Sequence, residues 1–375
     1  MSKSYTPGLK VLKYSKVSKE RLLPLKGKVH VDVDNKVNSD AIVASTEIPG
    51  NVQMLNMVNK LNIDPSQINE CMKVSLNDRV LQGQVIAENK GLFGWFKSEV
   101  KSPIDGQIIN ISDVTGQVVI SEKPLPIQVD AYISGKISKV YQEDGVVVTS
   151  EGTFIQGIIG IGGEKKGKIK VLVDSPDKSA SLDMLNIDCK DSIIVCGKYL
   201  SFDFYEKAKE IGVKGIICGG IDYDSISKIL GYTMGVAITG TEKTVTLIIT
   251  EGFGSINMAE KTFNLIKNNE NNFASINGAT QIRAGVLRPE IFIKSESTKA
   301  SKDFSEDDLI ISIGSNVRVI REPYFGKIGT ITNLPSELQI MKSETKVRVA
   351  EVQFKDKTIK IVPRANLEVI LSNEW

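Results

Sequence analysis

The feature that most constrains this chain is its content of β-branched aliphatic residues. Ile occurs 46 times and Val 35 times among 375 residues. These side chains are stiff at χ1 and pack well on a half-buried pleated surface. A chain of this length usually divides into two or three domains of about 150 residues. We therefore predict a multidomain, β-rich α+β protein.

Composition excludes several functional classes. No run of about 18 apolar residues is present to span a bilayer. The first 16 residues, MSKSYTPGLKVLKYSK, lack the apolar core of a signal peptide, so we expect a cytoplasmic protein. The formal net charge of +2 provides no strong field toward nucleic acid or anionic lipid. His30 is the only histidine and the four cysteines show no C-x-x-C spacing, so we expect neither a metal site nor a cofactor.

Turn signals and hydrophobic periods divide the chain into segments. Short alternating runs between turn dipeptides such as Asp105-Gly106 predict strands of small barrels or sandwiches in the first half. Within it, apolar residues at i+3 steps between Val52 and Leu61 predict one short amphipathic helix. The expected segments are a β-rich hammerhead or barrel region at 1–187, an α/β domain at 188–272, a returning β segment at 273–294, a polar linker at 295–309 and a small β barrel at 310–375.

The period changes between residues 188 and 272. Strands are predicted at 192–197, 214–220 and 245–250, and each is followed by a predicted helix, at 204–211, 223–230 and 257–267. This alternation indicates an inserted three-stranded parallel α/β domain with right-handed crossovers.

The strand ends of that domain carry a candidate ligand site. Asn257 and Glu260 have the spacing of an N-cap and its N3 partner, and the preceding glycines would let backbone N–H groups approach an anion. The carboxyl ends of parallel strands border one crevice. The alternative is plain turn chemistry, because strand-to-helix turns need glycine. The candidate ligand-binding residues are Gly219, Gly220, Asp222, Glu251, Gly252 and Gly254.

We predict no catalytic residues. Asp222 and Glu251 could face each other as paired carboxylates, but no histidine, thiol pair or metal-ligand cluster supports them. Residues 162–168 satisfy G-x-x-x-x-G-K, yet Ile169 stands where a Mg²⁺-binding Ser or Thr belongs. The residues that follow alternate like a strand, so we reject a nucleotide site there.

Two stretches, VSLNDRVLQGQVIA (74–87) and EVKSPIDGQI (99–108), resemble a biotinyl/lipoyl-type hammerhead. They are also similar to the N-terminal part of the C subunit of Rnf-type ferredoxin:NAD oxidoreductases, although no iron–sulfur cysteine cluster is present. In such carrier domains the modified lysine lies eight residues before the proline, here Pro103. Trp95 occupies that position and Lys97 is two places away, so the resemblance implies a structural hammerhead.

The loop KGLFGWFK (90–97) gathers aromatic residues in a chain with only 6% of them. Phe93, Trp95 and Phe96 either plug the end of a barrel or form an exposed patch that docks a partner.

The stretch GSNVRVIREPYFGKIGTI (314–331) resembles a KOW motif, the SH3-like barrel of NusG-type elongation factors and ribosomal proteins. Such modules bind RNA or protein, and some pack against their own chain. The residues that the resemblance makes candidates for partner binding are Arg318, Arg321, Tyr324 and Phe325.

Over its full length the chain resembles a family from anaerobic bacteria whose genes accompany those of adenosylcobalamin-dependent amino-acid aminomutases and their reactivating factors. The stretches that carry the resemblance are FIQGIIGIGGE (154–164), TEGFG (250–254) and ASINGATQIRAG (274–285). The resemblance implies an aminomutase system as partner.

These features favour a non-catalytic scaffold or accessory protein that binds a macromolecular partner. An RNA- or ribosome-associated factor acting through the KOW-like module is a second hypothesis. A small-molecule sensor or enzyme that uses the α/β crevice is a third.

We predict that Ser295 to Asp308 is the internal segment most sensitive to protease, because it combines polarity and charge with few apolar anchors. Limited trypsin digestion should cut first near Lys299 or Lys302 and release a C-terminal fragment. A first cut within 190–270 would contradict the segment boundaries given above.

Overall fold

Strands dominate the computed structural model, with 49% strand and 15% helix. The expectation of a β-rich α+β protein with several sheets is confirmed. None of the described helices is long and apolar enough to cross a membrane. The structure describes residues 9–89, 97–232, 237–238, 244–281, 287–295, 310–321, 323–324, 327–341, 346–354 and 356–371.

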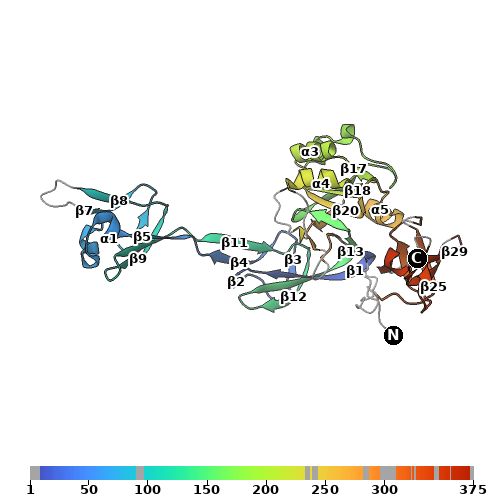
Figure 1. The fold of residues 1–375 in the computed structure, drawn as a ribbon, viewed down its shortest axis with the longest axis horizontal. Coiled ribbons are helices and arrows are strands. Elements are labelled where there is room, and N and C mark those ends of the chain that lie inside the picture. Colours follow the sequence, from blue (N-terminus) through green and yellow to red (C-terminus); the bar gives the residue numbers. More distant parts are fainter. Residues whose placement is uncertain are drawn as a thin grey trace.

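A curved antiparallel sheet lies at the centre of the molecule (Figure 1). The long strand β13 pairs with β1 on one side, and with β12 and β23 on the other. The ladder continues from β23 through β21 to β15. Its strands are β1 (Leu9–Leu22), β3 (Lys36–Val37), β12 (Gly135–Tyr141), β13 (Gly145–Gln156), β15 (Glu164–Val171), β21 (Phe273–Asn277) and β23 (Glu290–Lys294).

The two faces of this sheet pack on different cores because side chains alternate along each strand. Phe154 and Phe292 pack with the fully buried Tyr132, whereas Ile155 and Ile291 pack toward the parallel sheet.

A parallel sheet continues from the edge strand β15. It contains more parallel strands than the predicted three, because β15 pairs parallel with β16 and the short β17 pairs parallel with β18. The segment from Glu164 to Val171 is rich in lysine, a composition that does not predict a strand paired on both sides. Further elements of this region are β14 (Ile159–Ile161), β16 (Ile193–Val195), β17 (Tyr199–Leu200), α3 (Phe202–Ile211), β18 (Gly215–Ile221), α4 (Tyr223–Leu230), β20 (Thr246–Phe253) and α5 (Glu260–Lys267), with the 3-10 turns η3 (Leu182–Met184) and η4 (Ile187–Cys189) and the short pair β19 (Ala237–Ile238) and β22 (Thr280–Gln281).

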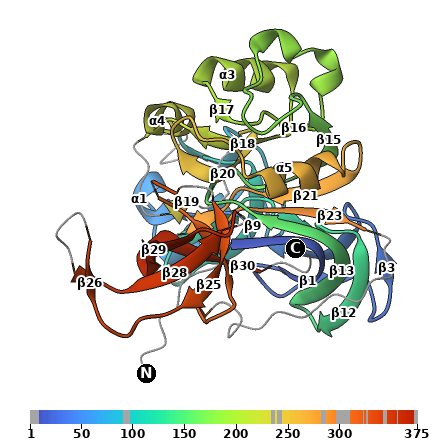
Figure 2. The same ribbon diagram turned by 90° about the vertical axis from the view of Figure 1, so that its right-hand side faces the viewer.

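Helices cover both faces of the parallel sheet, as Figure 2 shows. Ile216 and Cys218 pack with α3 and α4 on one face. Ile217 and Ile248 pack with Phe263 of α5 on the other face, where the antiparallel sheet is also buried. The near-continuous apolar strands of this region are explained by this two-sided burial.

A separate β unit lies at the far end of the molecule (Figure 1). We call it the distal unit, residues 49–89 and 97–124. It has its own core around Met57, Ile86 and Ile108. Its elements are β5 (Val52–Asn56), α1 (Met57–Leu61), η1 (Pro65–Gln67), α2 (Ile68–Cys71), β6 (Arg79–Val80), β7 (Val85–Asn89), β8 (Ser98–Lys101), β9 (Gly106–Ser112) and β10 (Gln117–Ser121).

The single helix predicted between Val52 and Leu61 is wrong in its first half. Residues 52–56 form β5, which pairs with β10, and only the last turn is helical. Asn56 explains the change, because its side chain accepts a hydrogen bond from the backbone N–H of Asn59 and starts α1 there.

A two-stranded ribbon connects the distal unit to the rest of the molecule. It is formed by β4 (Ile42–Ile48) and β11 (Leu125–Asp130), which are antiparallel, with β2 (Lys28–Val29) beside β4. The distal unit is therefore an insertion between two paired strands, inside the region predicted as one segment at 1–187.

The C-terminal residues form a third β unit, with strand order β29-β28-β25-β24-β30. Its last strand pairs parallel with β1, and Leu12 of β1 contributes to its core. The predicted linker lies outside the described residues except for Ser295. The elements are β24 (Asn316–Val319), β25 (Ile328–Asn333), β26 (Gln339–Ile340), β27 (Lys346–Val347), β28 (Val349–Phe354), β29 (Ile359–Pro363), η6 (Arg364–Asn366) and β30 (Leu367–Leu371).

Candidate functional site

The six residues predicted to line the α/β crevice lie at the ends of β18 and β20. These two strands pair there, Gly220 with Gly252. A Cβ atom on Gly220 would overlap the carbonyl oxygen of Gly254, and one on Gly219 would overlap that of Ile256. The chain's own backbone therefore covers these strand ends, and the two glycines of β18 serve this close approach. Gly252 and Gly254 have φ values of +141° and +97°, which glycine adopts without strain.

The two carboxylates of this region have separate partners. Asp222 is exposed and accepts a hydrogen bond from the hydroxyl of Tyr199 at 2.5 Å. This hydrogen bond, with a smaller contribution from burial, raises the pKa of Tyr199 to about 12. Glu251 is 6% exposed and bonds elsewhere. The pair is not arranged as a general acid and base acting on one group.

Glu251 caps α5 from outside the helix. Its Oε1 accepts a hydrogen bond of 2.8 Å from the backbone N–H of Ala259, the N-cap residue. The predicted N-cap, Asn257, is therefore wrong by two residues. A carboxylate at a helix N-terminus is also favoured by the helix dipole.

The other oxygen of Glu251 binds Arg318, which sequence reasoning had placed on a docking surface. Arg318 is 4% exposed. Its guanidinium donates to Glu251 at 2.5 Å and to Glu368 at 2.8 Å. Because the side chain is buried and doubly paired, it is not part of an exposed docking surface.

We call these residues, with Arg288, the Arg318 network. Arg288 lies 3.5 Å from Glu368, so two cations balance two anions. Burial alone would lower the pKa of Arg318, but the carboxylates of Glu251 and Glu368 outweigh it and the pKa is raised. The network joins β20 and the start of α5 to the C-terminal strands β24 and β30.

The remaining candidate docking residues are spread over the C-terminal unit and the aromatic loop. Arg321 is exposed. Tyr324 is half-buried, with its ring 5.5 Å from that of Phe354 and packed on the C-terminal core. The other four, Phe325, Phe93, Trp95 and Phe96, lie outside the described residues.

Other reactive side chains are held by ordinary structural contacts. Lys97 forms ion pairs with Glu99 at 2.6 Å and with Glu88 at 3.5 Å, and the hydrogen bond to Glu99 raises its pKa. His30 is exposed and shares a hydrogen bond with Ser45. Burial raises the pKa of the Cys196 and Cys218 thiols. Within the described residues, no group of three or more His, Cys, Asp or Glu side chains is placed to hold a metal ion.

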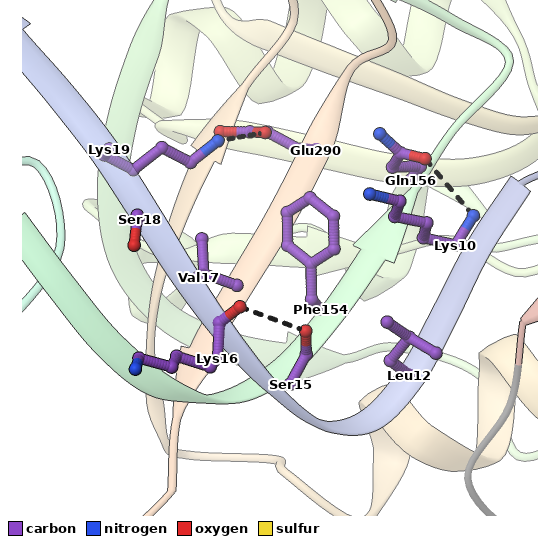
Figure 3. A pocket seen from close by; sticks show the side chains of 10 residues that line it. All are labelled: Lys10, Leu12, Ser15, Lys16, Val17, Ser18, Lys19, Phe154, Gln156 and Glu290. Carbon is purple, nitrogen blue, oxygen red and sulfur yellow. Dashed lines mark hydrogen bonds and ion pairs between the residues drawn. The ribbon is translucent and has the colours of Figure 1, made fainter. Parts of the chain in front are cut away.

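Sequence reasoning missed a pocket on the antiparallel sheet, shown in Figure 3. Its volume is about 400 Å³. The lining residues are Lys10, Leu12, Ser15, Lys16, Val17, Ser18, Lys19, Phe154, Gln156 and Glu290. The available signal was the recurrence of lysine at 10, 13, 16 and 19, which does not fit the period of a regular strand.

Comparison with protein-family models and with curated proteins identifies no relative. No protein-family model matches the chain, and a search of curated proteins gives no significant match. Functional inference for this protein therefore depends on its geometry and on the resemblances that its sequence carries.

We predict that Arg318→Met lowers the free energy of unfolding by about 3 kcal/mol or more, because it leaves buried carboxylates without their cation. Urea denaturation of the full-length protein measures this loss. Arg321→Met removes the same charge from an exposed position three residues away and should change the value by less than about 0.5 kcal/mol.

The same variant should have a distinctive pH dependence. In the variant, the buried carboxyl groups that lack their cation should be harder to ionise in the folded chain than in the unfolded chain. The folded variant is therefore destabilised less as the pH falls and these groups take up protons. The deficit of Arg318→Met relative to the natural protein should therefore shrink between pH 7.5 and pH 5. A deficit of similar size for both arginine variants, independent of pH, would contradict the assigned role of the network.

Proposed function

We propose that this protein is a non-catalytic cytoplasmic scaffold or accessory protein, and that its distal unit binds a macromolecular partner. The observation that carries the proposal is the placement of this unit on the β4–β11 ribbon, away from the other sheets (Figure 1). A catalytic role would require no such projection. A projecting unit can reach a partner without obstruction by the rest of the chain.

Exposed apolar side chains on the distal unit support this function. Met54 is 68% exposed and Val52 is 52% exposed, two residues apart on β5 and therefore on the same face of its sheet. Ile109 on β9 is 45% exposed and Val114 in the next turn is 82% exposed. Exposed apolar side chains gathered on one unit are typical of a surface that binds another macromolecule.

We further propose that the distal unit is a hammerhead that carries no acyl group. The antiparallel pair β7–β8 flanks the loop in which carrier domains present their lysine. Here Trp95 occupies the carrier position in sequence. The ammonium group of Lys97 is paired with two carboxylates, and its raised pKa keeps it protonated and a poor nucleophile.

The intact mass of the protein from its native host tests this second proposal. We expect no mass increment from biotin or lipoate on any lysine, because Trp95 cannot be acylated. An acyl group located at Lys97 by peptide sequencing would overturn it.

The first partner to test is an adenosylcobalamin-dependent aminomutase or its reactivating factor, as the family resemblance implies. A second candidate function, RNA binding by a KOW-like C-terminal barrel, is favoured by the antiparallel order β29-β28-β25-β24-β30 and by the exposed Arg321. The third hypothesis, a ligand in the α/β crevice, is disfavoured because backbone covers Gly219 and Gly220.

Affinity purification of the full-length protein from its native host distinguishes the first two functions. We predict that Met54→Lys and Trp95→Ala each reduce the retained partner about tenfold or more, since anchors at an interface are worth about 2 kcal/mol or more. Melting temperatures should fall by no more than a few degrees. Ile340→Lys is the matched control, because Ile340 is also 68% exposed but lies in the C-terminal unit.

Normal retention of the partner by Met54→Lys and Trp95→Ala would contradict docking through the distal unit. Loss of the partner only in Ile340→Lys would place the interface on the C-terminal unit. Nucleic acid in the purified complex, seen in the ratio of absorbance at 260 and 280 nm, together with steep loss on adding salt, would favour RNA as the partner.

A further inference from the structure

We propose that the pocket on β1, β13 and β23 binds a small organic phosphate monoester. It lies apart from the distal unit and from the α/β crevice, so it does not depend on the function proposed above. Its floor is apolar and consists of Leu12, Val17 and Phe154, which are 1%, 8% and 7% exposed. Its rim is polar and cationic (Figure 3). An apolar floor with a few polar groups is typical of a ligand site.

A β-bulge in β1 creates this arrangement. The register against β13 shifts between Leu12 and Ser15, so two positions on β1 face one on β13 and β1 contains one extra residue. Such a shift reverses which residues point to a given face. Lys10 and Leu12 before the bulge and Val17 and Lys19 after it therefore share one face. In a regular strand, Lys10 and Lys19 would point to opposite faces.

The charge around the pocket favours an anion. Lys10, Lys19 and Glu290 extend their side chains on the face of the pocket, a formal excess of one positive charge, whereas the side chain of Lys16 points away from it (Figure 3). Lys19 is paired with Glu290 at 2.5 Å. Lys10 forms no ion pair with a described acidic residue. A phosphate monoester carries about two negative charges at neutral pH and is attracted by this excess and by the ammonium group of Lys10.

The hydrogen-bonding groups are placed to hold such a ligand. Figure 3 shows the side chains of Lys10 and Gln156 at one wall and that of Lys19 at the opposite wall, with the ring of Phe154 between them. Oε1 of Gln156 accepts from the backbone N–H of Lys10 at 3.2 Å, which fixes the orientation of its amide. The amide N–H₂ and the lysine ammonium groups are the donors, and a phosphate offers three strong acceptor oxygens to them. The organic part of the ligand would pack on Phe154.

Isothermal titration of the full-length protein with phenyl phosphate, at constant ionic strength and pH 7.5, tests the proposal. We expect saturable binding with one site per chain. Lys10→Gln should weaken it about tenfold or more, since a charge-assisted hydrogen bond is lost. Lys101→Gln removes the same charge from an exposed position on the distal unit and should leave the affinity unchanged.

A second variant is expected to improve binding, which misfolding could not imitate. Glu290→Gln keeps an oxygen that can accept the hydrogen bond from Tyr132 but removes the anionic partner of Lys19. The freed ammonium should tighten binding of phenyl phosphate severalfold. Binding should weaken below about pH 6, where the phosphate takes up its second proton.

Three results would overturn the proposal. One is the absence of measurable heat with phenyl phosphate up to about 10 mM. Another is equal affinity in the natural protein and Lys10→Gln. The third is binding of benzoate or phenol as tight as that of phenyl phosphate, which would mean that the pocket does not select the phosphate group.

Discussion

The guanidinium of Arg318 is the point on which the arrangement of the C-terminal half depends. It binds Glu251, which lies near the end of β20 and caps α5, and Glu368, which lies on β30. Two buried carboxylates and one buried cation are costly to remove from water, and they are tolerated only when geometry and additional hydrogen bonds compensate. A displacement of the C-terminal unit would leave these charges unpaired, so its orientation on the α/β region is fixed. This arginine, a candidate docking residue in the sequence, is turned toward its own chain.

A second charged cluster fixes the root of the ribbon. Arg21 on β1 binds Glu164 through two nitrogens and also contacts Asp130 at the end of β11. Lys166 is 11% exposed and pairs with the same aspartate at 2.6 Å. Because these half-buried pairs join β11 to β1 and β15, the ribbon leaves the central sheet in a defined direction. The distal unit is therefore held out on a rigid base, which would reduce the entropy lost if it binds the proposed partner.

Local patterns in the sequence predicted those parts of the fold that local interactions determine. The abundance of Ile and Val predicted a strand-rich protein, and the predicted helix at 223–230 agrees with α4 in both bounds. The helix that ends at Ile211 was also found, since Gly212 adopts the left-handed conformation that ends it. The residues that determine these elements lie close to one another in the sequence.

The errors arose where distant residues decide the structure. Asn257 has the spacing of an N-cap, but Glu251 takes the N–H of Ala259 in its place. Residues 52–56 have apolar positions at helical steps, yet pairing with β10 makes them a strand. Burial of Arg318 depends on two carboxylates that lie 67 and 50 residues away in sequence. The pocket depends on a bulge whose register is set by β13, and no pattern within β1 alone specifies it.

The pocket and the ribbon root belong to one connected set of polar groups. Glu290 accepts hydrogen bonds from Lys19 in the pocket and from the hydroxyl of Tyr132, and the backbone N–H of Tyr132 donates to Asp130. Contiguity alone does not make a switch, because coupling also requires an element with two arrangements of similar energy. Tyr132 is fully buried and keeps a φ of +62°, a conformation that persists only where its surroundings hold it in place. An anion bound in the pocket would therefore add stability to a root that is already rigid, and the distal unit would keep its direction whether the pocket is filled or empty.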